Sequence, residues 1–251
     1  MDLENKYILI TGGSRGIGKA TALAFAEKGA TVGINYHSDD EAADTTLGLL
    51  KGKNHKAFKY DIANREEVRR LVQDFINTYG TIDVLVNNAG VSAFHSVEDD
   101  FEAWDRAWDK ILNVNLKAAA GLTYWASREM IRHGGGRIIN VSSRGAFRGE
   151  PTKPAYAASK AALNAFSQSM AKALAHHKIY VFAVAPGFTE TDMAKTTLTE
   201  RERERLMEES PFKRMAQPEE VAHAIVYFAS EGAEYSSGAI LDINGASYLR
   251  T

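Results

Sequence analysis

The residues whose types and spacing could do chemistry are Tyr156 and Lys160, four positions apart in the stretch YAASK. On a helix, residues i and i+4 share one face, so the two side chains would lie next to each other. The phenol of tyrosine has an ordinary pKa of about 10, and a neighbouring ammonium is expected to lower it by favouring the phenolate. The pair could then give a proton to a carbonyl oxygen or take one from an alcohol. By itself, a Tyr/Lys pair on a helix is more often a simple surface pair.

A second polar group, Ser143, stands at the carboxyl end of a predicted strand, where its hydroxyl can hydrogen-bond and position a substrate oxygen. Its neighbour Ser142 would point to the other face, because successive strand side chains alternate. The stretch VSS lacks the Gly-x-Ser-x-Gly turn of a nucleophilic serine, which disfavours a Ser/His/Asp hydrolase. No metal site is suggested, since the adjacent His176 and His177 would diverge by about 100° on a helix and form a poor chelate.

The glycine-rich stretch TGGSRGIGKA, residues 11–20, is the candidate cofactor site. It follows the first apolar run and opens the first helical pattern, as a phosphate-binding turn of a dinucleotide fold requires. Gly12, Gly16 and Gly18 allow a tight turn and a close approach to a pyrophosphate, whose charge a helix N-terminus stabilises. The spacing is Gly-x-x-x-Gly-x-Gly and not the general Gly-x-Gly-x-x-Gly. A plain flexible turn is the alternative interpretation.

Short apolar runs alternate with longer amphipathic segments, and these elements must position the polar groups. The predicted strands are residues 7–11, 31–36, 57–61, 84–87, 137–142, 179–185 and 239–243. The predicted helices are residues 19–28, 66–79, 101–132, 156–175 and 219–230. This alternation predicts an α/β protein with right-handed βαβ units and one seven-stranded parallel sheet covered by helices on both faces. No linker, repeat or low-complexity tract divides the chain, so residues 1–251 are predicted to form a single dinucleotide-binding and catalytic domain.

The bulk composition narrows the class of protein. A formal net charge of −2 over 251 residues gives no broad basic field that would attract nucleic acid or an anionic membrane. There are no cysteines, which excludes disulfides, thiolate metal sites and a cysteine nucleophile, and fits a reducing compartment. The N-terminal stretch lacks the pattern of a signal peptide, and no run of about 18 apolar residues could span a bilayer. We therefore expect a cytoplasmic protein with no nucleic-acid or membrane partner.

Six motifs in a fixed order point to one family. Thr-Gly-x-x-x-Gly-x-Gly at residues 11–18 is followed by NNAG at 87–90, NVN at 113–115, VSS at 141–143, YAASK at 156–160 and PGFTETDM from 186. Together they resemble the short-chain dehydrogenase/reductase family over residues 6 to about 245. The stretches SRGIG, APGFTETDM and SSGAILDINGA are most similar to its 3-oxoacyl-[acyl-carrier-protein] reductase-like branch. The resemblance implies a single-domain Rossmann fold, an NAD(P)-dependent oxidoreductase acting on CH–OH groups, and a homotetramer.

The resemblance also implies roles for individual residues. Tyr156 would be the general acid or base, and Lys160 its partner and a contact to the nicotinamide ribose. Ser143, thirteen residues before the tyrosine, would hold the substrate oxygen. Asn115 would hold a water in a proton relay to Lys160, or else be a helix-interior amide that satisfies backbone groups. The cofactor-binding residues implied by position are Thr11, Gly12, Ser14, Arg15, Gly16, Ile17, Gly18, Tyr36, His37, Ser38, Asp61, Ile62, Asn88, Ala89, Gly90, Tyr156, Lys160, Pro186, Gly187 and Thr189.

The choice between NADPH and NADH depends on the end of the second predicted strand, in the stretch VGINYHSDD. A carboxylate there would bond both ribose hydroxyls and repel a 2′-phosphate. This chain has Tyr36 in that place, and the two aspartates that follow come too late to replace it. Arg15 offers a charged donor to a phosphate, and His37 and Ser38 could add hydrogen bonds. These residues favour NADPH, although an arginine like Arg15 also occurs in NAD-using relatives.

Several residues could form the walls of a substrate site beside Ser143 and Tyr156. The candidates are Phe94, His95, Arg144, Phe147, Glu150 and the segment 193–215. In this family a closing lid would lie at about residues 190–215. The charge block at 199–209 lies inside that segment and is expected to be a solvated helix face, with a mobile flap as the alternative.

Some positions depart from the carrier-protein reductase pattern. Phe182 replaces an asparagine usual in the sixth strand, and His177 stands where a basic residue is expected. Arg132 and Lys172 remain candidates for contacting an acidic carrier. Aromatic residues in the long helical segments are expected to be mostly core, with some pairing subunits by resemblance; they are Trp104, Trp108, Trp125 and Phe166.

Three functions remain open from the sequence. The first is an NADPH-dependent reductase of a ketone or 3-oxoacyl group, and the second is an NAD-dependent alcohol dehydrogenase of a small or sugar-like substrate. The third is a dinucleotide-binding regulator without catalysis. The set Asn115, Ser143, Tyr156 and Lys160 is intact, which speaks against the third, because a sensor need not keep it.

Overall fold

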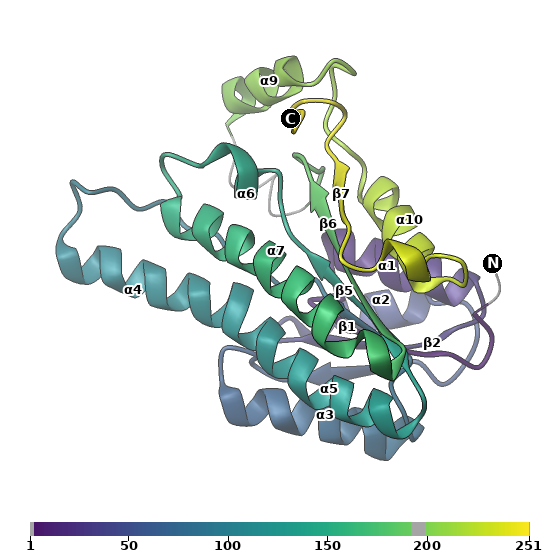
Figure 1. Ribbon diagram of the computed structural model, residues 1–251. Helices are drawn as coiled ribbons and strands as arrows, with labels where there is room; N and C mark the ends of the chain where they lie inside the picture. Colours follow the sequence, from purple (N-terminus) through teal and green to yellow (C-terminus); the bar gives the residue numbers. More distant parts are fainter. Residues whose placement is uncertain (1–2, 192–198, 251) are drawn as a thin grey trace.

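The computed structural model describes residues 3–191 and 199–250, and one parallel sheet forms its centre (Figure 1). The strands are β1 (Tyr7–Thr11), β2 (Thr31–Tyr36), β3 (Lys56–Lys59), β4 (Val84–Asn87), β5 (Gly136–Val141), β6 (Ile179–Pro186) and β7 (Ile240–Ile243). They are hydrogen-bonded in the order β3-β2-β1-β4-β5-β6-β7, and every neighbouring pair is parallel. The expected seven-stranded Rossmann-like α/β fold is confirmed.

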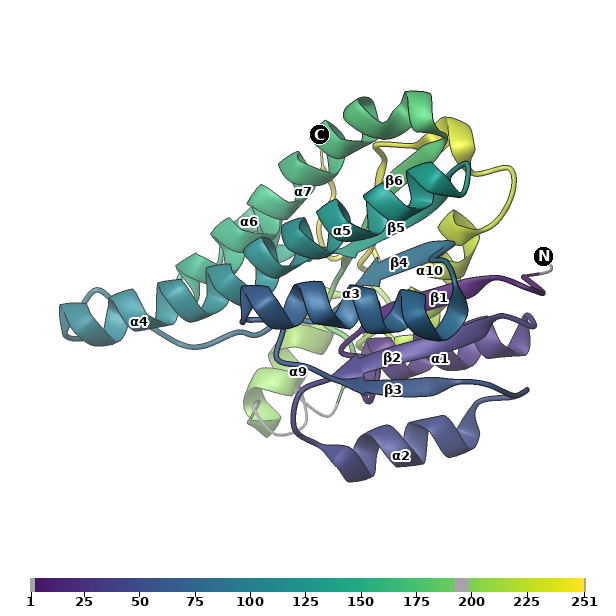
Figure 2. The same ribbon diagram turned by 90° about the horizontal axis from the view of Figure 1, so that it is seen from below.

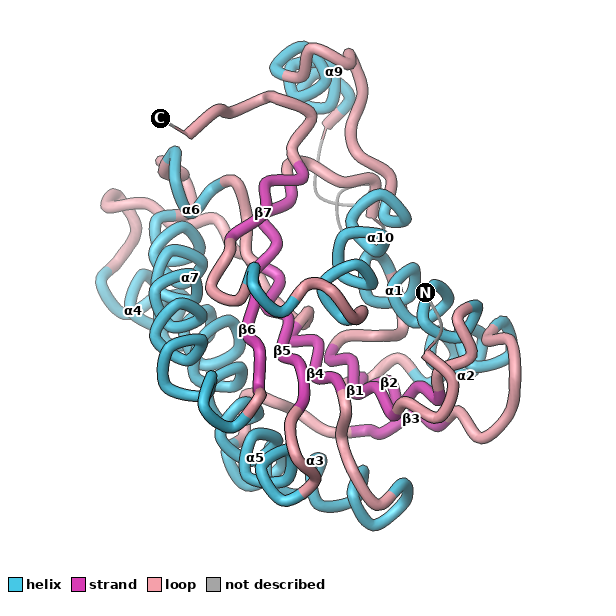
Figure 3. The backbone as a smooth tube through the Cα atoms, turned by 45° about the vertical axis from the view of Figure 1, so that its right-hand side comes forward, coloured by secondary structure: helices cyan, strands magenta, loops and turns pink. Residues whose placement is uncertain are grey.

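Helices cover both faces of this sheet. They include α1 (Gly16–Glu27), α3 (Arg65–Tyr79), α4 (Phe101–Leu112), α5 (Ala119–Arg132), α7 (Pro154–Leu174) and α10 (Pro218–Ala229). Figure 3 shows α3, α5 and α7 on one face and α1 and α10 on the other. Each face of the sheet has its own hydrophobic core, and successive residues of β1 point into opposite cores. Ile8 and Ile10 pack with α1 and α10, while Leu9 packs with α3, α5 and α7. Because both faces are buried, the strands are apolar throughout instead of alternating with polar residues.

The strand order creates a crevice at the carboxyl edge of the sheet. Strands β2 and β3 follow β1 on one side of the sheet, and β5, β6 and β7 follow β4 on the other side. At such a switch point the loops after the two neighbouring strands diverge and leave room for a ligand. The glycine turn follows β1, the NNAG motif ends β4, and Ser143 lies just beyond β5. The topology therefore brings motifs that are distant in sequence to one edge.

The long helix predicted over residues 101–132 is interrupted. The chain forms α4, then a π-helical turn at Asn113–Ala118, then α5 (Figure 2). A π-helical turn widens a helix locally and commonly marks a functional site. Here it contains Asn115, whose side-chain amide accepts a hydrogen bond from the Val91 N–H (2.8 Å) and donates one to the Val91 carbonyl (2.9 Å). Residues 101–132 are therefore helical, as predicted, and the π-helical turn within them, which the sequence did not predict, is accompanied by a contact from the loop after β4.

The charge block forms α9 (Glu200–Glu209), as expected for a solvated helix, and Leu206 is its buried residue. Thr199 caps the helix and forms a reciprocal capping box with Glu202. Within the predicted lid and substrate wall, residues 192–198 lie outside the described part of the chain. A further helix that the sequence reasoning did not predict, α2 (Asp40–Leu49), starts at the end of the loop after β2.

The aromatic residues expected to be mostly core, Trp104, Trp108, Trp125 and Phe166, are all half-buried. Trp125 packs against the core cluster that α3 and α5 form with the sheet. In the described ranges no helix has both the length and the apolar character to cross a membrane. Those ranges also contain no cluster of three or more His, Asp or Glu side chains able to hold a metal ion.

Candidate active site

A cavity of about 590 Å³ opens at the carboxyl edge of the sheet, a size within the range of about 300–1,000 Å³ typical of ligand sites. Both the glycine turn and the catalytic candidates line it. The predicted residues in its wall are Gly12, Ser14, Arg15, Gly16, Ile17, Tyr36, His37, Ser38, Asp61, Ile62, Asn88, Ala89, Gly90, Ser143, Tyr156, Lys160, Pro186, Gly187 and Thr189. Thr11, Gly18 and Asn115 lie behind this wall.

The glycine turn is fastened to the end of β4 by two polar side chains. Thr11 Oγ1 accepts hydrogen bonds from the main-chain N–H groups of Asn88 and Ala89, both at 3.0 Å. In return, the Asn88 side-chain amide donates to the carbonyls of Thr11 (2.9 Å) and Gly12 (3.1 Å). Thr11 therefore shapes the turn from behind. Gly18 also lies behind it, since a Cβ there would stand 2.1 Å from the Gly12 carbonyl oxygen.

This cradle fits the pyrophosphate of a dinucleotide. Gly12 and Gly16 have φ angles of 61° and 53°, which residues with a side chain rarely adopt. Helix α1 begins at Gly16, so its positive N-terminal end faces the cavity, and its first turn contains no acidic residue that would compete with an anion. The plain flexible turn considered above does not explain why such a cradle opens into a large cavity.

The carboxylates that follow β2 are already engaged. Asp39 lines the cavity, but its Oδ1 accepts a hydrogen bond at 3.0 Å from the first turn of α2 and caps that helix. Asp40 accepts from the Tyr36 hydroxyl (2.7 Å) and from Lys59 Nζ (2.7 Å). The bond to Asp40 raises the pKa of Tyr36 to about 12. Arg15 is exposed at the N-cap of α1, and its guanidinium makes no hydrogen bond or ion pair within residues 3–191 and 199–250, so it is available to a ligand.

Sequence reasoning missed several residues of the cavity wall, and Asn35 is the most informative of them. Its buried side-chain amide donates to the carbonyls of Tyr36 (3.2 Å), Phe58 (3.2 Å) and Tyr60 (3.0 Å). It thereby holds together the carboxyl ends of β2 and β3, which border the cavity. An amide inside the otherwise apolar run VGINY was the signal that could have revealed it.

The predicted substrate walls divide into two groups. Arg144 and Glu150 line the cavity, whereas Phe94, His95 and Phe147 do not. His95 is buried, with Nδ1 bonded to a carbonyl two residues earlier (3.0 Å) and Nε2 accepting from a main-chain N–H near the start of α7 (3.2 Å). It therefore supports the first turn of the helix that carries Tyr156 and contributes nothing to the wall.

Ser143 and Tyr156 both line the cavity, with the Ser143 side chain close enough to the Tyr156 hydroxyl to affect its pKa. Burial raises the pKa of Tyr156, the Ser143 side chain opposes that rise, and the negative charge of Glu150 adds to it. The pKa of Tyr156 is thus raised in the protein itself, because desolvation of the phenolate is the dominant effect. The lowering expected from Lys160 together with the positive nicotinamide of an oxidised cofactor stays a prediction. The phenol keeps its proton at neutral pH, which is the form that a general acid needs.

Lys160 is buried beneath the tyrosine. Its Nζ donates to the Val141 carbonyl at 2.7 Å and lies 5.8 Å from the centre of the Tyr156 ring. Burial lowers the pKa of Lys160 to about 8. The chain at Gly90 lies close to this side chain, since a Cβ there would stand 3.3 Å from Nζ and 3.4 Å from Asn115 Oδ1. Lys160 and Asn115 therefore both pack against the loop after β4.

The side chain of Asn115 makes its hydrogen bonds to other groups of the protein. Besides its two bonds to Val91, its Nδ2 donates to Ser159 Oγ at 3.0 Å, and the residue is 1% exposed. Gly90 packs against both Asn115 and Lys160, and the part of Asn115 in a proton relay stays a prediction.

The pKa of Lys160 predicts how stability depends on pH. Its value of about 8 in the fold lies below the ordinary 10.5, so between these values the unfolded chain binds more protons than the folded one. Stability then rises with pH, and this contribution is full above the ordinary value and is lost as pH falls through the folded value. We expect the free energy of unfolding of the wild type minus that of Lys160→Met, measured by urea denaturation, to rise across this window. A difference that stays flat with pH would contradict the assigned pKa.

Comparison with known proteins adds the following. The family model described as short chain dehydrogenase matches residues 6–202. A curated relative from Thermotoga maritima, named 3-oxoacyl-[acyl-carrier-protein] reductase FabG, is 39% identical over 251 residues, covering 98% of each chain. Proteins of the same name from Staphylococcus epidermidis (32% identical, 98% of this chain and 100% of the relative) and Chlamydia trachomatis (37% identical, 97% of both) are also similar.

Proposed function

Because this chain belongs to the short chain dehydrogenase family, and so is an NAD(P)-dependent oxidoreductase of CH–OH and keto groups, we propose that it reduces a 3-oxoacyl thioester with NADPH. The family resemblance predicted from the sequence is confirmed by these matches. In this proposal Tyr156 gives the proton and the glycine turn after β1 binds the pyrophosphate. The names of the relatives support the substrate class, since each is a 3-oxoacyl-[acyl-carrier-protein] reductase.

One observation carries the proposal. The same cavity is lined by a glycine cradle suited to a pyrophosphate and by the side chains of Ser143, Tyr156 and Lys160. A dinucleotide bound along this wall would bring its reactive end to the place where these side chains can hold a carbonyl oxygen. Pro186, Gly187 and Thr189 would border that end.

The residues of the chain then divide the reduction between them. A bound nicotinamide cofactor would supply the hydride that goes to the carbonyl carbon. Tyr156 gives its hydroxyl proton to the carbonyl oxygen, and Ser143 holds that oxygen through its own hydroxyl. The ammonium of Lys160 stabilises the phenolate left on Tyr156, and its second contact would be the nicotinamide ribose. Asn115 would hold the water through which Lys160 is reprotonated.

The preference for NADPH rests on the charges around the end of β2. Arg15 is exposed beside the cavity, and the carboxylates of Asp39 and Asp40 are bonded to groups of this chain. A 2′-phosphate would therefore meet an available guanidinium, with His37 and Ser38 in the same wall.

Removal of this guanidinium tests the preference. We expect Arg15→Ala to lower kcat/KM for NADPH by about tenfold, the scale of one charge-assisted phosphate contact, and to leave kcat/KM for NADH nearly unchanged. The measurement is initial-rate kinetics with both cofactors, and Lys19→Ala, one helical turn further along α1, serves as the matched control. An equal loss with both cofactors would remove Arg15 from recognition of the 2′-phosphate.

Recognition of an acyl carrier protein is the finer part of the proposal. Phe182 is one of the departures from the family pattern. Its ring stacks on that of Phe228, with the ring centres 4.5 Å apart, and it is fully buried, so it belongs to the hydrophobic core. Lys172 is exposed, and Arg132 pairs with Glu129 at 2.9 Å while remaining largely accessible. These two cations would face the acidic surface of a carrier.

Assembly into a homotetramer in the cytoplasm completes the proposal. On α4, the rings of Trp104 and Trp108 lie 5.2 Å apart at a tilt of 43°, and their buried indole N–H groups have no hydrogen-bond partner among the described residues. Phe101 on the same helix is 68% exposed. A helix that leaves aromatic area uncovered is typical of a subunit contact, which supports pairing through α4.

The function is tested by NADPH oxidation with a panel of 3-oxoacyl thioesters, ketones, quinones and sugars. We expect the thioesters to give the highest kcat/KM. A protein that binds NADPH but oxidises it with none of them would be the regulator considered above. Faster oxidation of an alcohol by NAD would favour the dehydrogenase alternative.

A further inference from the structure

A second, smaller cavity of about 200 Å³ adjoins the catalytic one. It lies among Phe188, Leu206 of α9 and the segment that follows β7, including Asn244. Of their described lining residues, the two cavities share Arg144 and Phe188. These two side chains therefore form the partition between the catalytic cavity and the space beneath α9.

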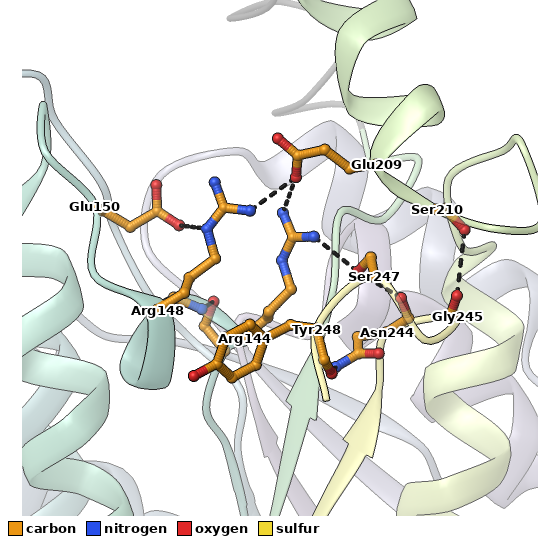
Figure 4. A network of polar contacts seen from close by, with 11 residues as sticks. Arg144, Arg148, Glu150, Glu209, Ser210, Asn244, Gly245, Ser247 and Tyr248 are labelled. Carbon is orange, nitrogen blue, oxygen red and sulfur yellow. Dashed lines mark hydrogen bonds and ion pairs between the residues drawn. The ribbon is translucent and has the colours of Figure 1, made fainter. Parts of the chain in front are cut away.

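The Arg144 side chain is fixed across this partition. Its guanidinium lies 5.0 Å from the centre of the Phe188 ring and is 3% exposed. One of its terminal nitrogens donates to Ser247 Oγ at 2.7 Å and the other to Glu209 Oε2 at 2.8 Å (Figure 4). Removing the partners of a buried cation strongly destabilises a protein. Glu209 and Ser247 therefore keep the Arg144 side chain in place between the two cavities.

The second cavity is suited to an uncharged hydrocarbon chain. Leu206 and Met215, both buried, supply apolar wall. The guanidinium of Arg214 in the same wall is used in a two-point ion pair with Glu220, at 2.6 and 2.7 Å. Asp242, also in the wall, has one buried carboxylate oxygen without a hydrogen-bond partner in the described part of the chain, which disfavours a second anion. An alkyl tail would pack against the apolar part of this wall, which Phe188, Leu206, Met215 and Ile243 supply.

We propose that Arg144 is the specificity-determining residue of this reductase: with Phe188 it ends the catalytic cavity and closes off a distal site for the far end of a longer alkyl chain. This inference rests on the proposed function, whose 3-oxoacyl substrate supplies the chain. Alone, about 200 Å³ is too small for a typical ligand site. As an extension of a cavity that already holds the reacting end, it would admit additional methylene groups.

The test compares chain-length profiles of variants at the partition. Arg144→Ala removes the side chain and leaves Glu209 paired with Arg148, at 2.7 Å. We expect the ratio of kcat/KM for a long-chain to a short-chain 3-oxoacyl thioester to rise by about tenfold or more, since each methylene moved from water to an apolar wall is worth about fourfold. Arg144→Met is the matched control, because it keeps the bulk and loses the charge. Its ratio should stay close to that of the wild type.

A second variant keeps the test decisive if Arg144→Ala does not fold. Phe188→Ala opens the partition from its other side and leaves the ion pair of Arg144 in place, and it should raise the same ratio. A ratio that stays at the wild-type value in the folded opening variants would overturn the proposal. If this ratio rose as much in Arg144→Met as in Arg144→Ala, the proposal would also be overturned. The charge of Arg144, and not the bulk of its side chain, would then determine the preference for chain length.

A readout without catalysis separates this inference from the proposed function. A wild type that reduces no thioester would refute the proposed function only. The partition is then tested by the rise in Tm that straight-chain alcohols of increasing length give, because a ligand that binds the folded state stabilises it. In Arg144→Ala the rise should continue to longer alcohols than in the wild type, and identical series would overturn the proposal.

Discussion

Replacing Tyr156 by phenylalanine should lower kcat by about 10²- to 10⁴-fold, the usual cost of losing a positioned general acid. The variant lacks the hydroxyl that would donate the proton, but keeps the ring whose centre lies 5.8 Å from Lys160 Nζ. The glycine cradle is untouched, so the Kd for NADPH should remain near the wild-type value. Initial rates of NADPH oxidation and a fluorescence titration of NADPH measure the two quantities.

The matched control is Tyr235→Phe, which removes the same atom from a fully exposed side chain. It should leave both kcat and the Kd unchanged. Retained turnover in Tyr156→Phe would remove Tyr156 from the proton transfer. Loss of turnover together with loss of NADPH binding would indicate a structural effect on the cavity instead of the loss of an acid.

Replacing Gly18 by alanine should destroy the cofactor cradle. The new Cβ would stand 2.1 Å from the Gly12 carbonyl oxygen and 2.6 Å from Asn88 Nδ2, so the turn and the amide that fastens it must both move. Overpacking of this kind costs about 1–3 kcal/mol of the free energy of unfolding. Because the displaced groups form the pyrophosphate cradle, we also expect NADPH affinity to fall by more than about tenfold, equivalent to about 1.4 kcal/mol.

Gly48→Ala provides the control for this variant. Gly48 lies inside α2, and nothing stands within 4 Å of a Cβ built there. Alanine is the better helix former, so this variant should gain about 0.5–1 kcal/mol and bind NADPH normally. Urea denaturation of both variants measures the free energy of unfolding, and NADPH titration measures the Kd. An alanine tolerated at position 18 with normal NADPH binding would show that the turn does not form the cradle.

Most of the sheet could be predicted because its strands are buried on both faces and are therefore apolar runs between turns. The errors lie at the ends of elements, as with the third strand, predicted over 57–61 and observed at Lys56–Lys59. Helix α2 was missed because its pattern is weakly amphipathic, with Ala43 and Thr46 as its buried residues. Local sequence thus determines which segments become strands and leaves their limits to tertiary contacts.

Features of the site that depend on contacts between distant segments could not be predicted. The π-helical turn accompanies hydrogen bonds between Asn115 and Val91, 24 residues apart. The direction of the Tyr156 pKa depends on how deeply the phenol is buried, which spacing along one helix does not reveal. The sequence suggested Arg144 as a wall, but its partners Glu209 and Ser247 are 65 and 103 residues away, so its position across a partition became visible only in the fold.

The assignment as an NADPH-dependent 3-oxoacyl reductase is tested most directly by one comparison. It is the kcat/KM for NADPH and for NADH, measured with the same 3-oxoacyl thioester under identical conditions. We predict that the thioester is reduced and that NADPH is preferred by at least about tenfold, as expected for one charge-assisted contact to the 2′-phosphate. A preference for NADH above about tenfold, or no reduction of the thioester with either cofactor, would contradict the assignment.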